Sequence, residues 1–255
     1  MVNCQITCIF AAPGGRMEGG AGVKLSLVIP AYNESAIIEA TLRTVTARLA
    51  DIDPEYELIV VDDGSTDGTA DLVRPFESEH VRALGYRPNR GKGCAVRTGM
   101  LAARGEYVFH TDADLAYGLE NIPDMLSKFE ETGADLVVGS RKLNGDGYRD
   151  YPPLRLMASK CFSLLTRMVA GMNYDTQCGI KGFTRDAARA IFSKCTTDGF
   201  AFDFEVLLRA KRMGLRVEQE AVTIVNHRDS KVNVLRDSLR MFRDMLRIRR
   251  QVDRT

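Results

Sequence analysis

Short runs of apolar, often β-branched residues alternate with helical patterns from Lys24 onward, and no other feature of the chain constrains its fold as much. Between these runs, apolar residues recur at spacings of three and four, as in Ile38, Leu42, Val45 and Leu49, which is the period of a helix packed on one side. Strands separated by helices form βαβ units, so we predict an α/β fold with a mostly parallel sheet flanked by helices. The expected strands are residues 25–30, 57–62, 81–86, 106–111 and 135–140.

The chain beyond residue 141 has a less regular pattern, which still fits one compact unit. A loop is expected first, followed by helices near residues 154–169, 185–192 and 200–214. With 255 residues, 45% of them hydrophobic, the chain can bury the core of one large domain. We therefore predict a disordered leader at residues 1–23, one globular domain at 24–231 and a basic amphipathic helix at 232–255.

Overall charge and cysteine usage argue against several classes of protein. The formal net charge is +1, so no global excess of positive charge indicates a nucleic-acid partner, and we expect none. The six cysteines are scattered without a C-x-x-C pair, which favours reduced thiols in a cytoplasmic protein over disulfides or a zinc site. No apolar run approaches the roughly 18 residues of a membrane-spanning helix, so we expect any membrane contact to be peripheral, on the cytoplasmic face.

Charged residues stand at the points where the predicted strands end. The segment "PAYNE" completes the first strand, "VDDGSTDG" the second, "TDADLA" the fourth and "GSRK" the fifth. Parallel strands end at the same edge of a sheet, and the ligands of such sheets bind beyond that edge. Carboxylates that converge there repel one another unless a cation or a polar ligand offsets their charge. We favour a binding site at this edge over the alternative of ordinary Asp-rich turns.

The "DAD" motif at residues 112–114 is the most informative of these strand ends. Asp112 and Asp114 aim at one point if the backbone between them is extended, and their oxygen ligands suit Mg²⁺ or Mn²⁺. Proteins usually hold Mg²⁺ with one or two carboxylates together with substrate phosphates, so the motif indicates a metal-bound diphosphate. His110, just before the motif, is interpreted as a core side chain with satisfied hydrogen bonds rather than as a ligand.

Two further turns add polar groups at the same edge. Asp62 and Asp63 offer acceptors to a base or a ribose, whereas the glycines and hydroxyls that follow are explained by a tight turn and a helix cap. The stretch "RPNRGKG" brings Arg90 and Lys92 ahead of a helix, where such a turn closes over phosphates or is simply a solvated basic turn. It matches neither the P-loop nor the G-x-G-x-x-G spacing.

Taken together, these stretches resemble a known family. "LSLVIPAYNE", "IVVDDGSTDGT", "NRGKGCAVRTGM" and "TDADL" are similar to the successive motifs of family 2 glycosyltransferases. The distal stretches "DTQCGIKGFTRDAA" and "FAFDFEVLLRAKRMG" resemble the dolichyl-phosphate β-glucosyltransferase branch and its polyprenyl-phosphate relatives. The resemblance covers roughly residues 24–250. It implies the GT-A fold, an Mg²⁺ or Mn²⁺ ion and a nucleotide-sugar donor.

The resemblance also implies a role for individual positions. The expected donor and nucleotide site is Pro30, Tyr32, Glu34, Asp62, Asp63, Lys92 and Asp112. The expected acceptor-phosphate site is Arg141, Arg155, Arg228 and Lys231, with Ser230 in the same closing loop. Asp112 and Asp114 would hold the metal, and Gln177 would lie near the metal and the reacting sugar. Asp203 would orient a sugar hydroxyl or act as a base, and Glu205 completes its acidic pair.

The reaction that the resemblance implies is inverting transfer of glucose from UDP-glucose to a polyprenyl phosphate. Ala116 and Phe200 depart from residues typical of these branches, which keeps transfer of mannose from GDP-mannose open as an alternative. A nucleotidyltransferase is disfavoured because "PAYNE" stands where a triphosphate loop is needed. A non-catalytic nucleotide-sugar-binding protein is the remoter alternative, and the oligomeric state stays open between a monomer and a homodimer.

The tail has the pattern of a basic amphipathic helix. Its apolar stripe is expected to contain Val234, Leu235, Leu239, Phe242 and Leu246, with Met245 at the margin. Six arginines surround the stripe between residues 236 and 250. Such a helix lies in an anionic membrane interface or packs on its own domain with a solvated basic face, and an expected lipid acceptor favours the membrane.

Overall fold

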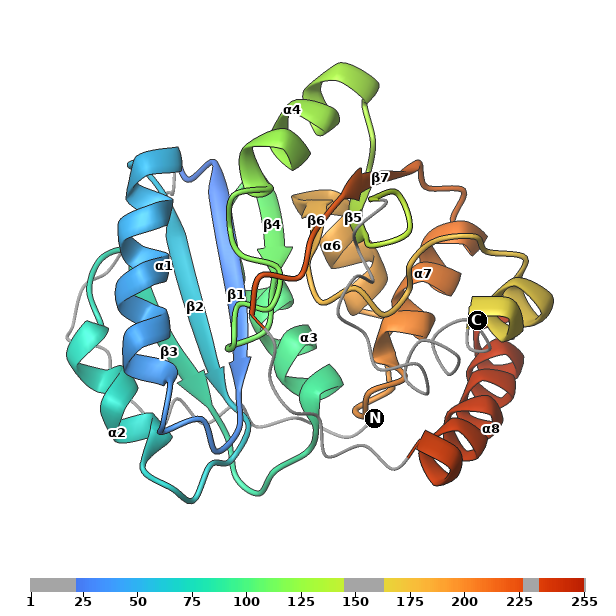
Figure 1. Cartoon of the computed structure of the whole chain (residues 1–255), viewed down its shortest axis with the longest axis horizontal. Helices are drawn as coiled ribbons and strands as arrows, with labels where there is room; N and C mark the ends of the chain where they lie inside the picture. Colours follow the sequence, from blue (N-terminus) through green and yellow to red (C-terminus); the bar gives the residue numbers. More distant parts are fainter. Residues whose placement is uncertain (1–21, 145–162, 227–233, 255) are drawn as a thin grey trace.

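The computed structural model describes residues 22–144, 163–226 and 234–254, with side chains of the last segment described from residue 242 on. One mixed sheet forms its centre, in the strand order β3-β2-β1-β4-β6-β5-β7 (Figure 1). All neighbouring strands pair in parallel except at β6, which is antiparallel to both β4 and β5. The strands are β1 (Leu25–Ala31), β2 (Glu57–Asp62), β3 (Val81–Gly85), β4 (Tyr107–His110), β5 (Leu136–Ser140), β6 (Lys181–Thr184) and β7 (Val217–Ala221).

Helices cover both faces of this sheet. The apolar residues of α1, α2 and α4 pack on one face, while those of α3, α6, α7 and α8 pack on the other. A further helix at residues 163–170 contributes to the second of these layers. The helices are α1 (Ile38–Ile52), α2 (Thr69–Val73), α3 (Lys92–Ala102), α4 (Ile122–Thr132), α6 (Arg185–Phe192), α7 (Phe202–Arg212) and α8 (Val234–Val252), and a short 3-10 helix, η1, spans Arg74–Phe76.

The predicted fold class and the five predicted strands are confirmed, with boundaries that differ by at most one residue. The antiparallel strand β6 was not expected, and it separates β4 from β5, which the sequence placed in succession. The predicted leader falls mostly on residues 1–21, outside the described residues, as does the loop at 145–153. The C-terminal helix is present as α8.

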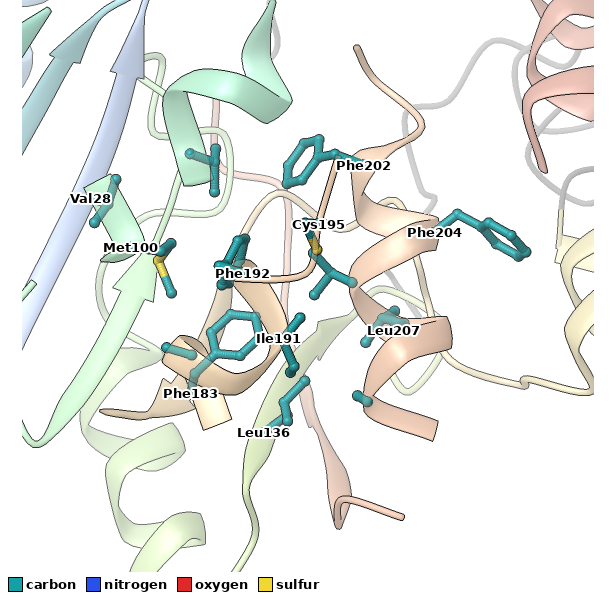
Figure 2. Close-up of a cluster of buried hydrophobic side chains, with 14 of the residues drawn as sticks. Val28, Met100, Leu136, Phe183, Ile191, Phe192, Cys195, Phe202, Phe204 and Leu207 are labelled. Atoms are coloured by element: carbon teal, nitrogen blue, oxygen red, sulfur yellow. The ribbon is translucent and has the colours of Figure 1, made fainter. Parts of the chain in front are cut away.

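The larger core lies between β6 and the helices α6 and α7, and its packing holds the strands whose ends carry the predicted site residues. Phe183 on β6 packs edge-on against Phe192 on α6, with ring centroids 5.4 Å apart. Figure 2 shows these rings beside Phe202 and Leu207 of α7, with Met100 on α3 nearby. All of these side chains are at most 2% exposed, so α7 is held tightly against the sheet.

Candidate active site

The strand order brings the predicted strand ends together. Strands β2, β1 and β4 are neighbours, so Asp62, the segment that begins at Tyr32 and the Asp112 loop lie at adjacent positions of one edge. Strand β5 runs in the same direction as β4 and ends at this edge before Arg141, while the antiparallel β6 begins there with Lys181. The edge therefore gathers acidic and basic side chains from both halves of the chain.

At the centre of this edge, Asp112 forms an ion pair with Lys92, the first residue of α3. Both side chains keep partial access to solvent, 29% for Asp112 and 22% for Lys92. Asp114 lies two residues further on, and its Oδ1 accepts a hydrogen bond of 3.1 Å from the Ala116 N–H. The next residue, Leu115, is buried with φ of 48°, a strained conformation for a branched residue and one that often marks functional loops.

A second ion pair lies beside the first and is less exposed to solvent. Lys181 is fully buried, and its Nζ lies 2.5 Å from Asp203 Oδ1 and 2.6 Å from the Cys178 carbonyl oxygen. Burial raises the pKa of Asp203, and the ammonium groups of Lys181 and Lys92 oppose that rise. Burial disfavours the charged form of Lys92 and by itself lowers its pKa. The negative charges of Asp112 and Asp203 together have the larger effect and raise the pKa of that lysine.

The two predicted nucleoside carboxylates differ in their surroundings. Asp63 is committed to the protein, because its carboxylate accepts hydrogen bonds from Asn89 Nδ2, Arg90 N–H and Gly91 N–H. Asp62 is 3% exposed, and its Oδ1 accepts the Ser65 N–H, while its Oδ2 lies 3.8 Å from Arg87 Nη1 and has no hydrogen-bond partner among the described residues. A buried carboxylate oxygen that accepts no hydrogen bond is costly, so Asp62 is the better candidate to accept a hydrogen bond from a ligand.

The remaining predicted donor residues lie on the neighbouring strand β1 and in the turn that follows it. Pro30 is the penultimate residue of β1 and pairs in register with Val61. Glu34 follows in the next turn, and both Pro30 and Glu34 are partly buried. Tyr32 is 46% exposed, so its ring is accessible at the edge of the sheet.

The N–H groups at the start of α3 are hydrogen-bonded to another part of the protein. The Gly93 N–H donates a hydrogen bond of 2.8 Å to the Asp198 carbonyl oxygen, and the Cys94 N–H donates to the same atom. The Asp198 side chain also binds Arg97 at 2.6 Å and Arg90 at 3.3 Å. The helix start is thus anchored to the loop before α7, and Lys92 extends from an immobilised backbone.

Arg141 is buried and held by a partner that sequence analysis did not identify. Its Nε and Nη2 each donate a hydrogen bond of 2.7 Å to the Asp175 carboxylate, and its backbone N–H donates to Asp175 as well. The two side chains are only 6% and 4% exposed. Burial alone would raise the pKa of Asp175, but the hydrogen bonds and charge of Arg141 hold it below its usual range.

Of the other predicted site residues, Gln177 and Glu205 belong to the described part of the chain and the rest do not. Gln177 is exposed between the buried residues Thr176 and Cys178, so its side chain faces solvent beside the Asp175 turn. Glu205 is buried on α7 and binds Arg209 and the backbone N–H groups of residues 196 and 197, so it holds the preceding loop. Outside the described residues lie Arg155, Arg228, Ser230 and Lys231.

His110 is a core side chain, as predicted, but the prediction that its hydrogen bonds are satisfied was wrong. It is 1% exposed between the rings of Phe183 and Phe202, and neither ring nitrogen has a partner among the described residues. Burial lowers its pKa well below the usual range, and Lys181 and Lys92 lower it further. The imidazole is therefore neutral.

Helix α8 packs on the domain rather than standing apart from it. Met245, Ile248 and Val252 are at most 6% exposed and belong to the core formed with α7. The expectation that Met245 lies at the margin of the apolar stripe was thus wrong, because the helix turns this side inward. The outward side forms a shallow depression lined by Arg243, Leu246, Arg247, Arg250, Gln251 and Arg254. None of the described helices is long and apolar enough to cross a membrane.

Comparison with known proteins identifies close relatives over most of the chain. The profile of glycosyl transferase family 2 matches residues 26–192. A dolichyl-phosphate β-glucosyltransferase of Dictyostelium discoideum is 35% identical over 243 residues, which cover 89% of this chain and 74% of the relative. A protein of the same name from Saccharomyces cerevisiae is 33% identical over 247 residues, covering 88% and 74%.

Solved structures share the fold at lower sequence identity. A glucosyl-3-phosphoglycerate synthase of Mycobacterium tuberculosis with Mn²⁺, UDP-glucose and phosphoglyceric acid superposes with a TM-score of 0.67 at 24% identity, covering 89% of this chain and 80% of that one. The same enzyme with Mg²⁺ and UDP gives a TM-score of 0.64 at 23% identity, covering 89% and 79%. The likeness confirms the predicted GT-A arrangement of the sheet and its helices.

Proposed function

The chain belongs to glycosyl transferase family 2, and we propose that it transfers glucose from UDP-glucose to a polyprenyl phosphate of the dolichyl type with inversion at the sugar. Relatives named for β-glucosyl transfer to dolichyl phosphate support this assignment. The observation that carries it is the acidic motif at the carboxyl edge of the sheet, where Asp112 and Asp114 lie close to Lys92 and Asp203 and share that edge with the buried Asp62.

The residues at this edge fit a divalent cation. The Lys92 ammonium already stands against Asp112, so the carboxylate is arranged to receive positive charge. A side chain at Gly179 would place its Cβ 2.5 Å from Asp112 Oδ2, so glycine leaves room at the second oxygen. No group of three or more His, Cys, Asp or Glu gathers as a metal site among the described residues, so Asp112 and Asp114 would share Mg²⁺ or Mn²⁺ with oxygens of the donor diphosphate.

The chemistry asks little of a protein base. The acceptor is a phosphate monoester with a second pKa of about 6, so at neutral pH it is already a nucleophile. Its oxygen forms a bond to the anomeric carbon while the bond from that carbon to UDP breaks, and UDP leaves with the electron pair. A bound divalent cation would offset charge on the departing diphosphate. Attack from the face opposite the leaving group converts the α-linked donor to a β-linked product.

Arg141 is the candidate to bind the acceptor phosphate. A guanidinium has five N–H donors in a rigid plane, and Asp175 accepts from two of its nitrogens, which fixes the orientation of that plane. Positioning of this kind aligns the attacking oxygen and shields its charge. Asp203 is suited to orient a sugar hydroxyl, because Lys181, 2.5 Å from its Oδ1, fixes the position of its carboxylate.

The decisive experiment offers the purified protein labelled UDP-glucose or GDP-mannose, with or without polyprenyl phosphate, in Mg²⁺ or Mn²⁺. We expect label to enter the organic phase only from UDP-glucose and only when lipid phosphate is present. Lipid label from GDP-mannose alone would replace the proposed donor. An organic phase free of label from both donors would contradict transfer to a lipid phosphate.

We further propose that the protein reaches its lipid acceptor as a peripheral protein on the cytoplasmic face of the membrane. The apolar side of α8 is buried against α7, so the arginine-lined outer side is what remains to contact a membrane. Arg247 and Arg250 lie on that side and are exposed. Arginines near an anionic bilayer contribute about 1 kcal/mol each to binding.

Vesicle flotation tests this contact. The double variant Arg247→Ala and Arg250→Ala is expected to bind phosphatidylserine-containing vesicles about 30-fold more weakly than the wild type, the equivalent of two such contacts. The matched control is Arg43→Ala with Arg74→Ala, which removes the same charge from exposed positions on α1 and η1. Equal loss in both double variants would show that net charge, and not the outer side of α8, determines binding.

A further inference from the structure

Lys92 occupies the acidic motif in a way that the proposed reaction does not explain. Its ammonium forms an ion pair with Asp112, one of the two carboxylates that the donor's metal ion would need. Asp203 and Asp114 also lie close enough to favour its charge. A lysine in this position competes with a divalent cation, because like charges a few ångströms apart repel.

The two lysines at this edge differ in their freedom to move. Lys181 is 0% exposed, and Asp203 and a backbone carbonyl fix the position of its ammonium group. Lys92 is 22% exposed, on the open side of the edge. Its backbone is held by the anchored start of α3, whose next residue, Gly93, donates to the Asp198 carbonyl oxygen. The side chain of Lys92 can therefore change partner while its backbone stays in place.

A diphosphate would supply the alternative partner. Lys92 stands between the nucleoside end of the edge, where Asp63 holds the loop just before it, and the acidic motif at Asp112. An ammonium that leaves Asp112 for a diphosphate oxygen removes the repulsion toward the metal and gains a partner of higher charge. The same diphosphate offers the metal further oxygen ligands. Departure of the lysine and arrival of the metal thus favour each other.

We propose that Lys92 acts as a resident cation of the acidic motif and exchanges its place on Asp112 for the donor's divalent ion when a nucleoside diphosphate binds. The exchange makes metal and nucleotide bind together and keeps the metal weakly bound when the nucleotide is absent. By linkage, each ligand tightens the other by the same factor. The inference rests on the proposed function for the identity of the diphosphate, but not for the Lys92 contact itself.

Binding of Mn²⁺, followed through the electron paramagnetic resonance signal of the free ion, tests the exchange without any turnover. We expect UDP to tighten Mn²⁺ binding to the wild type by more than about 10-fold, after correction for Mn²⁺ bound by UDP alone. In Lys92→Met, Mn²⁺ without nucleotide is expected to bind about 10-fold more tightly, and the factor by which UDP tightens it is expected to shrink. Lys92→Arg keeps the charge and should keep weak binding of Mn²⁺ alone.

A control variant and a second nucleotide separate the ways in which this inference can fail. Lys24→Met removes one exposed positive charge at the opposite edge of the sheet and should leave Mn²⁺ binding unchanged. Two results with Lys92→Met would overturn the exchange. One is an unchanged affinity for Mn²⁺ alone, and the other is tighter Mn²⁺ binding by the same factor with and without UDP, which would leave the UDP effect as large as in the wild type. Repeating the series with GDP distinguishes the two proposals, because linkage with GDP but not UDP supports the exchange and contradicts the proposed donor. Absence of linkage with both nucleotides would also overturn the exchange.

Discussion

Replacing Asp114 by asparagine is expected to lower kcat/KM for glucosyl transfer by at least about 100-fold. The substitution removes one of the two carboxylates that would hold the divalent ion on the donor diphosphate, and loss of charge stabilisation at a leaving group has effects of this size. Stability should change little, because an asparagine oxygen can still accept the hydrogen bond from the Ala116 N–H. Initial rates of lipid labelling from UDP-glucose measure the effect, alongside a thermal unfolding curve.

The control for this experiment is Asp124→Asn, which removes a carboxylate from the first turn of α4 and should keep wild-type rates. Raising the Mn²⁺ concentration should restore part of the activity of Asp114→Asn if the lost group binds metal. A variant that keeps more than a tenth of wild-type activity at low Mn²⁺ would contradict the assigned metal role of Asp114.

The central strands and their ends could be predicted because the relevant signals are local. A strand buried on both faces reads as an apolar run, and β1, β2 and β4 each carry one directly before a polar turn. Parallel pairing then places the three turns at one edge, whichever order the strands take. The partly exposed Tyr32 and Asp112 and the buried Asp62 therefore lie where the sequence placed them.

Strand β6 could not be predicted because its stability comes from distant parts of the chain. It has four residues, one of them the charged Lys181 and one Gly182, and its partners β4 and β5 lie some 40 to 75 residues earlier. A side chain at Gly182 would place its Cβ 2.5 Å from the Phe109 ring, so glycine there serves packing rather than a turn. The signal that was present is a lone lysine in an apolar stretch, which needs a buried partner and finds Asp203.

Partners of charged residues were the other part that sequence reasoning missed. The resemblance named Arg141 but not Asp175, and Lys92 but not its contact with Asp112. Ion pairs between residues 20 to 34 positions apart leave no periodic pattern, since they depend on how two loops meet above the sheet. Helix α8 shows the same limit, because its amphipathic pattern fits a membrane or a protein surface equally well and only packing on α7 decides which side is buried.

The second large effect is expected at the pair of Asp175 and Arg141. Asp175→Asn should lower the free energy of unfolding by about 3 kcal/mol at neutral pH, because it leaves a buried guanidinium without its counter-charge. The folded pKa of Asp175 is depressed, so the stabilisation is present above the unfolded value of about 3.9 and is lost as the pH falls through the folded pKa. Denaturant unfolding of both proteins from pH 7 down to pH 3 should show the difference shrinking in acid.

Two comparisons complete the test of this pair. Asp71→Asn breaks an exposed ion pair with Arg74 and should cost less than about 1 kcal/mol at every pH. Arg141→Lys keeps one positive charge but cannot reproduce the two parallel hydrogen bonds to Asp175. The KM for lipid phosphate should therefore rise about 10-fold, while the KM for UDP-glucose stays unchanged. If stability falls in Asp175→Asn while Arg141→Lys leaves the KM for lipid phosphate unaltered, the pair is structural and the acceptor phosphate is bound elsewhere.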